Sequence, residues 1–338
     1  IVRLYVAGIG HGFPGILLRG AVCAVCLLPP TVLMGATLPA VARWIETTPE
    51  GVAWLGFFYG ANIAGAVFGC LLAGFYLLRV HDTATATLVA ATVNWAVASI
   101  SLGLARRTPH RPSFGGPAHD DTVRAPRGPV YLAIALSGLC ALGAEVIWTR
   151  LLSLMLGGTV YTFSIILAVF LAGLGIGSGA GSFWSGRTAR PAVALACCQL
   201  LLAAGIAWTA YMLAHFVPYW RPSLSSGPWS KFQLDLLRCA WALLPATCLW
   251  GASFPLALAA AASPGQDPAR LAGGIYAANT AGAILGAVAF GLLLIPGIGT
   301  QHSQRLLIAL SAVAAFSAAR PGAALLSAAT CLSIVLAW

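Results

Sequence analysis

Long apolar segments recur along the whole chain and alternate with shorter polar connections. Each segment holds roughly 20 residues with few charges, which is the length that crosses the hydrocarbon core of a bilayer as a helix. Proline interrupts several segments, and we expect kinks there because neighbouring helices can satisfy the freed carbonyls. The predicted spans are residues 18–42, 52–78, 83–105, 129–149, 160–184, 192–216, 238–262, 271–296, 303–319 and 321–338. The pattern predicts an all-α, polytopic integral membrane protein with about nine or ten transmembrane helices.

Composition strengthens this prediction. The 338 residues are 59% hydrophobic and 8% charged, whereas soluble domains are about 45–50% apolar and about 25% charged. So few ionic groups cannot cover a water-facing surface, which excludes a soluble enzyme. The 18 basic and 8 acidic side chains give a net charge of +10, which we assign to arginines that flank the spans and contact anionic lipid. The expected partners are the lipid bilayer and other membrane protein subunits, with no nucleic acid. The expected location is the bacterial inner (cytoplasmic) membrane.

Two pairs of segments repeat at a nearly constant separation. Residues 28–39 (LPPTVLMGATLP) and 244–255 (LPATCLWGASFP) are identical at 7 of 12 positions, at an offset of 216. Residues 59–74 (YGANIAGAVFGCLLAG) and 276–291 (YAANTAGAILGAVAFG) are identical at 8 of 16 positions, at an offset of 217. The two copies start six predicted spans apart, an even number, so both cross the membrane in the same direction. Parallel repeats of this kind are typical of the two halves of major-facilitator transporters.

The repeat divides the chain into four parts. We expect the C-terminal half of a first membrane repeat at 1–105 and an Arg/Pro/Gly-rich connecting loop at 106–128. A second membrane repeat of about six helices follows at 129–319, and an additional hydrophobic helix at 320–338. The first three spans of the second repeat have no counterpart in this sequence. We therefore expect the first repeat to be incomplete, with about three spans missing through truncation or loss.

Four motifs carry a resemblance to a known family. They are PTVLMGATLP (30–39), YGANIAGAVFG (59–69), AEVIWTRLLSLMLGGTVYTFSIILAVFLAGLGIGS (144–178) and YAANTAGAILG (276–286). Together they resemble the membrane region of transmembrane spermidine-synthase-like proteins, also described as fused major-facilitator/spermidine synthase proteins. The resemblance implies a separate, soluble aminopropyltransferase domain after the membrane region, and this chain ends at Trp338, about where that domain would begin. GGPAHDD (115–121) follows no predicted strand and opens no helix, so it lacks the context of a nucleotide-binding loop.

Glu145 is the one acidic residue inside a predicted span. An ionised carboxylate at that depth is costly unless it is paired, so such residues are functional candidates. Arg150 lies five residues further on, about 7.5 Å along a helix axis. One interpretation is a carboxylate that binds a cation or couples to protons. The other is a structural clamp at the end of the span that holds Arg150 or a facing backbone group.

The second block of the repeat places polar residues on a ridge of glycines. The residues that share one helical face are Tyr59, Asn62, Gly65 and Gly69 in the first copy, and Tyr276, Asn279, Gly282 and Gly286 in the second. We expect the four glycines to pack helices together, because G-x-x-x-G lets helix backbones approach closely in a membrane. The asparagines and tyrosines either stabilise this helix interface or line a polar substrate or ion site there.

No metal or cofactor site is predicted. The six histidines and nine cysteines show no metal-ligand spacing, and the C-x-x-C formed by Cys23 and Cys26 has no second pair or histidine nearby. No catalytic residue can be assigned either. Three functions remain open: a non-catalytic membrane module that serves as scaffold or accessory subunit of a larger assembly, a transporter of a small cationic solute such as a polyamine, and a membrane anchor of an aminopropyltransferase whose soluble domain lies outside this sequence.

Overall fold

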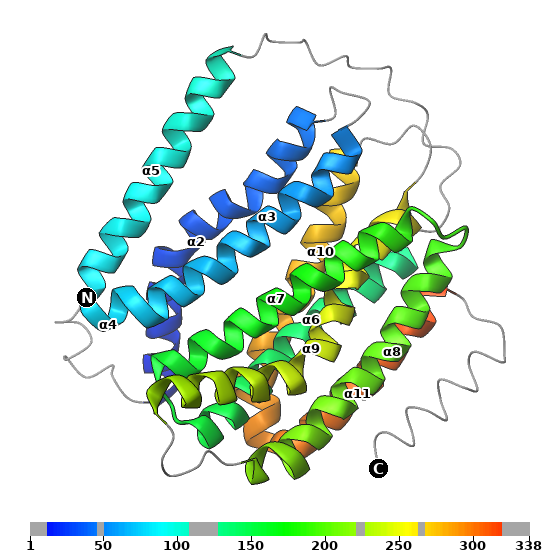
Figure 1. Ribbon diagram of the computed structural model, residues 1–338. Coiled ribbons are helices and arrows are strands. Elements are labelled where there is room, and N and C mark those ends of the chain that lie inside the picture. The colour runs from blue at the N-terminus through cyan, green and yellow to red at the C-terminus, as the bar shows by residue number, and fades with distance from the viewer. Residues whose placement is uncertain (1–11, 46–50, 108–127, 221–226, 263–267, 320–338) are drawn as a thin grey trace.

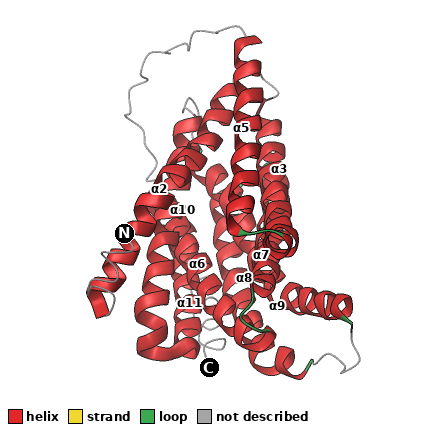
Figure 2. Cartoon of the chain, turned by 90° about the vertical axis from the view of Figure 1, so that its left-hand side faces the viewer, coloured by secondary structure: helices red, strands yellow, loops and turns green. Residues whose placement is uncertain are grey.

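The computed structural model describes residues 12–45, 51–107, 128–220, 227–262 and 268–319, and its regular structure within these ranges is entirely helical (Figure 1 and Figure 2). The α-helices are α2 (Gly12–Ile45), α3 (Gly51–Leu72), α4 (Leu78–Val80), α5 (Thr83–Arg107), α6 (Gly128–Leu156), α7 (Val160–Ser185), α8 (Pro191–Tyr211), α9 (Pro228–Ala261), α10 (Pro268–Ala289) and α11 (Ile295–Ala319). Three π-helical turns, η2 (Ala73–Leu77), η3 (Met212–Phe216) and η5 (Phe290–Leu294), and one 3₁₀ turn, η4 (Val217–Tyr219), continue some of them.

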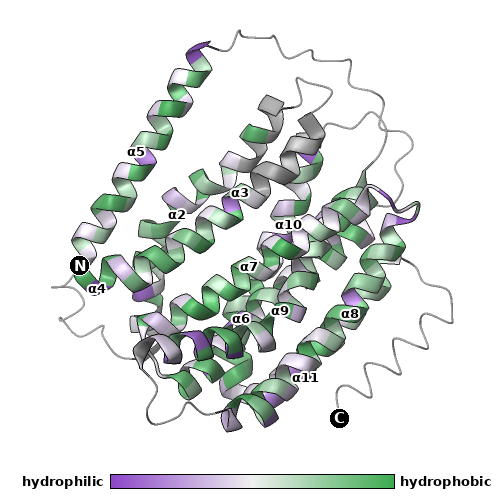
Figure 3. Cartoon of the chain, in the orientation of Figure 1, coloured by the Kyte–Doolittle hydropathy of each residue, from purple (hydrophilic) through white to green (hydrophobic). Residues whose placement is uncertain are grey.

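Eight helical stretches among the described residues are long and apolar enough to cross a membrane. Figure 3 shows hydrophobic residues along each of them and few hydrophilic ones. The eighth stretch, Arg270–Ala318, is 49 residues long and holds two of the predicted spans. They are separated at Gly299, whose φ of 78° breaks the helix. The chain is therefore an all-α protein with the helices of a multi-pass membrane protein.

Each predicted span from 18–42 to 303–319 falls on a described helical stretch, and the span 321–338 lies outside the described residues. The span predicted at 238–262 begins ten residues earlier, at Pro228. The sequence around Lys231 and Asp235 was too polar to be included, but Arg238 donates to the Asp235 carboxylate at 3.0 Å within the helix. This i, i+3 pair lies in the third turn of α9 and stabilises the helix where its polar first residues meet the apolar part.

Local sequence signals explain where several helices begin and end. α6 is followed by Gly157, whose φ of 99° is the left-handed conformation that a glycine adopts without strain. The Thr159 hydroxyl accepts from the Thr162 N–H and caps α7. Proline stands at the start of α8 and of α9, where its missing N–H costs no helical hydrogen bond.

The helices from α6 to α11 form a close-packed bundle around two clusters of buried apolar side chains. The fully buried members of the larger cluster include Trp148, Leu202, Ile206, Leu243 and Leu307, contributed by four helices. Glycines bring α7 against α9, because a Cβ at Gly177 or Gly181 would overlap the α9 backbone at Cys248 or Ala252. Small residues at a membrane helix interface allow this approach.

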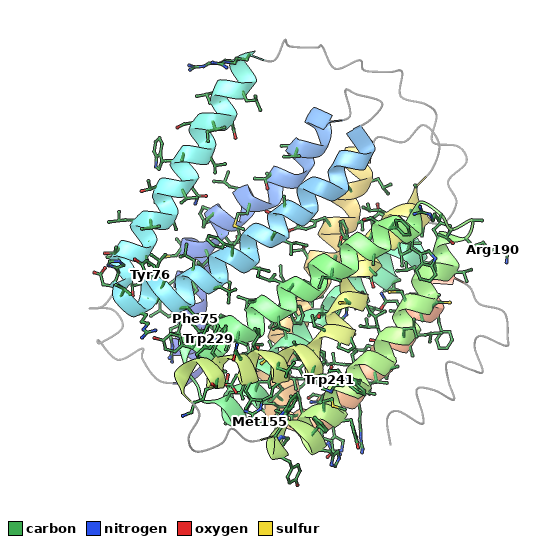
Figure 4. The ribbon with its side chains drawn as sticks, in the orientation of Figure 1. Phe75, Tyr76, Met155, Arg190, Trp229 and Trp241 are labelled. Carbon is green, nitrogen blue, oxygen red and sulfur yellow. The ribbon has the colours of Figure 1, made fainter. Side chains whose placement is uncertain are left out.

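The N-terminal helices lie beside this bundle and pack less. α3 contacts α7 through Ile63, which is buried over Gly175, and further along η2 places Gly74 against Ser164. Phe75 of η2 stacks edge-on against Phe232 of α9, with ring centroids 5.0 Å apart, close to the labelled Trp229 (Figure 4). α5 stands apart from the other helices (Figure 1), and none of its described residues is buried.

Corresponding elements of the N-terminal and C-terminal parts have equal lengths. α2 and α9 each hold 34 residues and begin 216 residues apart, at positions 12 and 228. α3 and α10 each hold 22 residues and begin 217 residues apart, at positions 51 and 268. A five-residue π-helical turn follows each of them directly, at positions 73 and 290. These separations equal the two offsets between the similar sequence segments.

Candidate functional site

Glu145 and Arg150, the predicted pair on α6, do not contact each other. Glu145 is half-buried and Arg150 is exposed, and they form no ion pair within 4.0 Å in the described structure. The five-residue separation turns Arg150 away from the face of Glu145, as the helical period requires. Glu145 instead shares its face with Trp148 and Leu152, which lie three and seven residues further along the helix and are both fully buried.

An aromatic cluster surrounds this face of α6. The rings of Trp148 and Trp250 are tilted with centroids 5.6 Å apart, and Phe170 of α7 stacks on Trp250 at 5.9 Å. Both indole Nε1 atoms are buried and have no hydrogen-bond partner in the described structure. Indole N–H groups usually find a partner when buried, so these two donors are available to an acceptor. The cluster thus combines a carboxylate one helical turn away with aromatic faces that attract cations.

The predicted residues of the glycine ridge on α10 lie near its contact with α6. A Cβ at Gly138 of α6 would overlap the backbone carbonyl oxygen of Asn279 and come within 2.8 Å of its side-chain oxygen. Tyr276 is 37% exposed and meets Phe254 of α9 edge-on, with centroids 6.3 Å apart. Gly282 and Gly286 lie against the α6 backbone, at the carbonyl groups of Ala135 and Leu139.

The first-copy residues are placed differently. Asn62, Gly65 and Gly69 are exposed on α3, and nothing lies within 4 Å of a Cβ built at either glycine. Tyr59 belongs to α3, but its side chain lies outside the described residues. The structure therefore brings Asn279 and Tyr276 next to other helices and leaves Asn62 on an open face. It gathers no common site from the described residues of the two copies.

A buried polar cluster links α6, α8 and α9 and was not predicted. The Gln199 amide Nε2 donates to the hydroxyls of Ser137 and Ser253, both at 3.0 Å, while its Oε1 is buried without a partner among the described residues. Cys198 lies beside it and donates to the Leu249 carbonyl at 3.3 Å. The signal was present in the sequence, because Gln199 is an amide in the middle of the apolar run ALACCQLLLAA. Such side chains hydrogen-bond across membrane helices.

Glu145 and the two buried indole N–H groups can contribute charge and hydrogen bonds. Glu145 forms no ion pair within 4.0 Å in the described structure. Among the residues that the structure describes, no three His, Cys, Asp or Glu side chains gather as metal ligands would. The described groups suit a cation, a hydrogen-bond acceptor, or another helix.

Comparison with known proteins adds a distant relation. The chain is 27% identical over 196 residues to polyamine aminopropyltransferase 2 of Streptomyces coelicolor. The match covers 56% of this chain and 34% of that protein, so the chain spans about a third of its relative's length. No protein-family model matches the chain, and no solved structure matches it. This similarity agrees with the resemblance to spermidine-synthase-like proteins. The fusion of a membrane region with an aminopropyltransferase domain is a finer statement than this similarity supports.

Proposed function

We propose that the chain is a non-catalytic module of the bacterial inner membrane, equivalent to the membrane part of spermidine-synthase-like proteins, and that it serves as scaffold or accessory subunit of a larger membrane assembly. The distant match to an aminopropyltransferase and the apolar helices support the first part. The exposed helices of the N-terminal part, α2, α3 and α5, support the second part, the role as scaffold or accessory subunit.

The packing of the two parts differs sharply. Half or more of the residues in the apolar stretches of α6, α7, α8 and α9 are buried, whereas none is buried in those of α2 and α5. Membrane helices associate through packing and hydrogen bonds rather than through a hydrophobic force, so a helix without such contacts gains nothing from its neighbours. Helices that carry packing residues and contact little of their own chain are what an assembly subunit presents to its partners.

A parallel internal repeat is part of this proposal. It is supported by the two similar sequence blocks and by the equal lengths of α2 and α9, of α3 and α10, and of the π-helical turns that follow. In the described structure, the apolar stretches of α2 and α5 hold no buried residue, which leaves helix faces open. Scaffold function then means that a partner completes the bundle.

The assembly is tested by isolation from the native membrane. The chain is tagged, extracted in a mild detergent and weighed by native mass spectrometry, with a tagged unrelated membrane protein as the control for carry-over. We expect a second membrane polypeptide in fixed stoichiometry. A chain that isolates alone, as a stable monomer, contradicts the proposal.

Transport of a small cation such as a polyamine is a second candidate, favoured by the half-buried Glu145, which shares a face of α6 with Trp148. The purified chain is placed in liposomes and uptake of radiolabelled spermidine is measured. Glu145→Gln removes the charge and is expected to abolish uptake, while Arg150→Gln, on the exposed side of the same helix, serves as the matched control. Uptake that survives Glu145→Gln removes this role from the carboxylate.

A membrane anchor for an aminopropyltransferase is a third candidate, and the match to the Streptomyces coelicolor protein favours it. The polypeptide encoded by the whole gene is produced and assayed for aminopropyl transfer to putrescine. Activity in that polypeptide, and its release into the soluble fraction when the membrane helices are removed, are the expected results for an anchor. If neither the activity nor the release is observed, the anchor role is contradicted and the scaffold role is retained.

A further inference from the structure

The turn between α7 and α8 carries two arginines that no acidic side chain neutralises. Arg187 and Arg190 are both exposed, and neither forms an ion pair in the described structure. The sequence has no aspartate or glutamate between Glu145 and Asp235. Because α7 and α8 are both long and apolar enough to cross a membrane, the turn that joins them is expected at the membrane surface. Two uncompensated positive charges therefore belong to that surface.

Arg187 is held in place by the last turn of α7. Its guanidinium carbon lies 3.5 Å from the centroid of the Phe183 ring, and its Nη1 donates to the Phe183 carbonyl at 3.4 Å. The N–H groups of Arg187 and Thr188 donate to the Trp184 carbonyl at 2.9 and 3.1 Å, so the backbone of the turn is tied to the helix as well. A guanidinium carries five N–H donors in a planar fork that matches the oxygens of a phosphate. The turn thus presents a pre-positioned donor group for an oxyanion.

Arg190 lies three residues further on and is the N-cap residue of α8. Its N–H donates to the Thr188 hydroxyl at 3.3 Å, and its carbonyl accepts from the N–H groups of Val193 and Ala194, both at 3.1 Å. The backbone of Arg190 is therefore tied to the turn on one side and to α8 on the other. Its side chain projects away from the bundle (Figure 4).

The exposed face of α7 changes from apolar to charged along its length. Ile176, Ala180, Phe183 and Arg187 follow one another at helical spacing and share this face, and all four are exposed. Phe183 lies about 10 Å beyond Ile176 along the axis, and Arg187 about 6 Å beyond Phe183. One headgroup layer of a bilayer is about 5–8 Å thick. The order of aliphatic, aromatic and basic side chains therefore follows a bilayer from its hydrocarbon core through the interface to the phosphates.

We propose that the α7–α8 turn binds an anionic phospholipid, with Arg187 and Arg190 on the headgroup phosphate and with Phe183 and Trp184 against the lipid below it. Phe183 is 65% and Trp184 is 67% exposed, so both rings are open to such a contact. This site goes beyond the scaffold role and does not depend on it. A charge-assisted hydrogen bond from a guanidinium to a phosphate is among the strong ones, and a net negative headgroup offsets the charge that the protein leaves uncompensated.

An acidic segment of a protein would also offset these charges, but the surroundings of the arginines favour the lipid. A protein segment that binds above the membrane has no use for the exposed rings of Phe183 and Trp184, which face the depth of the acyl chains and glycerol. A phospholipid contacts the rings and the arginines at once. The graded face of α7 therefore selects the lipid as the occupant.

The test is a lipid titration of the purified full chain, followed by native mass spectrometry. The two lipids are phosphatidylglycerol, which is anionic, and phosphatidylethanolamine, whose ammonium group neutralises its phosphate. We expect the first lipid to bind more tightly when it is phosphatidylglycerol. Arg187→Gln and Arg190→Gln should each weaken that binding about fivefold, the effect of one basic side chain near an anionic surface. Arg150→Gln, an exposed arginine near the other end of its helix, is the matched control and should leave the affinity for the first lipid unchanged.

Two further variants distinguish this site from diffuse attraction between charges. Phe183→Leu keeps both arginines but removes the ring beside Arg187, and should weaken phosphatidylglycerol binding about two- to fivefold. Arg187→Lys keeps the charge but loses the planar fork, so its binding should also be weaker than that of the unsubstituted chain. Circular dichroism verifies that each variant keeps its helices. If Arg187→Gln weakens binding while both of these variants bind normally, the turn acts only as diffuse charge and the proposal is overturned.

Other outcomes identify other occupants, and each overturns the proposal. An excess of inorganic phosphate should leave the lipid bound, because phosphate lacks the acyl chains that contact Phe183 and Trp184; displacement of the lipid identifies free phosphate as the ligand. Equal binding of the two lipids removes the preference for an anionic headgroup. Phosphatidylglycerol binding that survives the loss of both arginines leaves an acidic protein segment as their partner.

Discussion

The matched glycines Gly286 and Gly69 allow one substitution to be compared in a covered and an open setting. Gly286→Ala adds a Cβ that would lie 2.9 Å from the Leu139 Cα, whereas Gly69→Ala adds a Cβ with nothing within 4 Å. Carbon atoms pack best at about 3.5–4.0 Å. α10 must therefore move about 0.6 Å or more away from α6 at Gly286, and no helix must move at Gly69.

The cost follows from this displacement. A gap of about 0.5–1 Å forfeits a quarter to a half of each dispersion contact along the opened seam, and overpacking of this kind costs about 1–3 kcal/mol. We expect Gly286→Ala to destabilise the chain by about 2 kcal/mol, a change of about thirtyfold in the unfolding equilibrium. Gly69→Ala should lie within about 0.5 kcal/mol of the unsubstituted chain, as surface changes do.

The assay is reversible unfolding in mixed micelles of rising SDS content, followed by helical circular dichroism and by tryptophan fluorescence. Gly282→Ala and Gly65→Ala repeat the comparison one helical turn earlier. The reasoning is refuted if Gly69→Ala costs as much as Gly286→Ala, or if neither changes the unfolding midpoint. The first result means that α3 is covered in the isolated chain, and the second that α10 does not lie tightly on α6.

Three further results are expected. The Asp82 carboxylate accepts hydrogen bonds from Thr85, including one from its N–H at 2.9 Å, and they hold the pKa of Asp82 below its ordinary value. The ionised carboxylate therefore stabilises the start of α5 fully above the unfolded-state pKa of Asp82, and this stabilisation is lost as the pH falls through the lower folded-state pKa. Amide exchange at Thr85 should accelerate in that pH range, and Asp82→Ala should remove the pH dependence. Gln199→Leu keeps the volume and deletes two interhelical hydrogen bonds, so unfolding in SDS should show a loss of about 0.6–1.7 kcal/mol; no loss contradicts the bonds. Trp250→Phe removes a buried donor that has no partner in the described structure and keeps a ring, so it should cost far less than Trp250→Ala, for which about 3–5 kcal/mol is expected; equal costs would mean that the indole N–H is satisfied.

The helices were predictable from the sequence because apolar length alone identifies a membrane span. Nine of the ten predicted spans match described helical stretches, and the tenth lies outside them. Boundaries were less predictable at α9, where the Asp235–Arg238 pair extends an apolar helix into polar sequence. Hydropathy counts each charge as a break in a span, whereas a charge paired within the helix does not end it.

The candidate site was predictable only in part. Glu145 stood out because a lone carboxylate in an apolar run is visible in one sequence. Its surroundings, Trp148 and Trp250, come from helices about a hundred residues apart and required the fold. Nor could the sequence distinguish the two glycine ridges, since Gly69 and Gly286 stand in the same motif. Their difference lies entirely in what packs on them.

The paired π-helical turns determine where this chain can change length. A π-helical turn holds one residue more than the α-helix it interrupts, and each residue turns an α-helix by about 100°. Deleting one residue from Phe290–Leu294 would let this turn close as regular α-helix and leave α11 in place, whereas deleting one residue within α11 ahead of Leu307 would rotate the buried Leu307 and Ser311 by that angle. The connection 262–267, by contrast, is already one residue longer than its counterpart 46–50, which accounts for the change of offset from 216 to 217. Single-residue deletions in relatives should therefore fall between these helices or within the π-helical turns, and should spare the α-helices themselves.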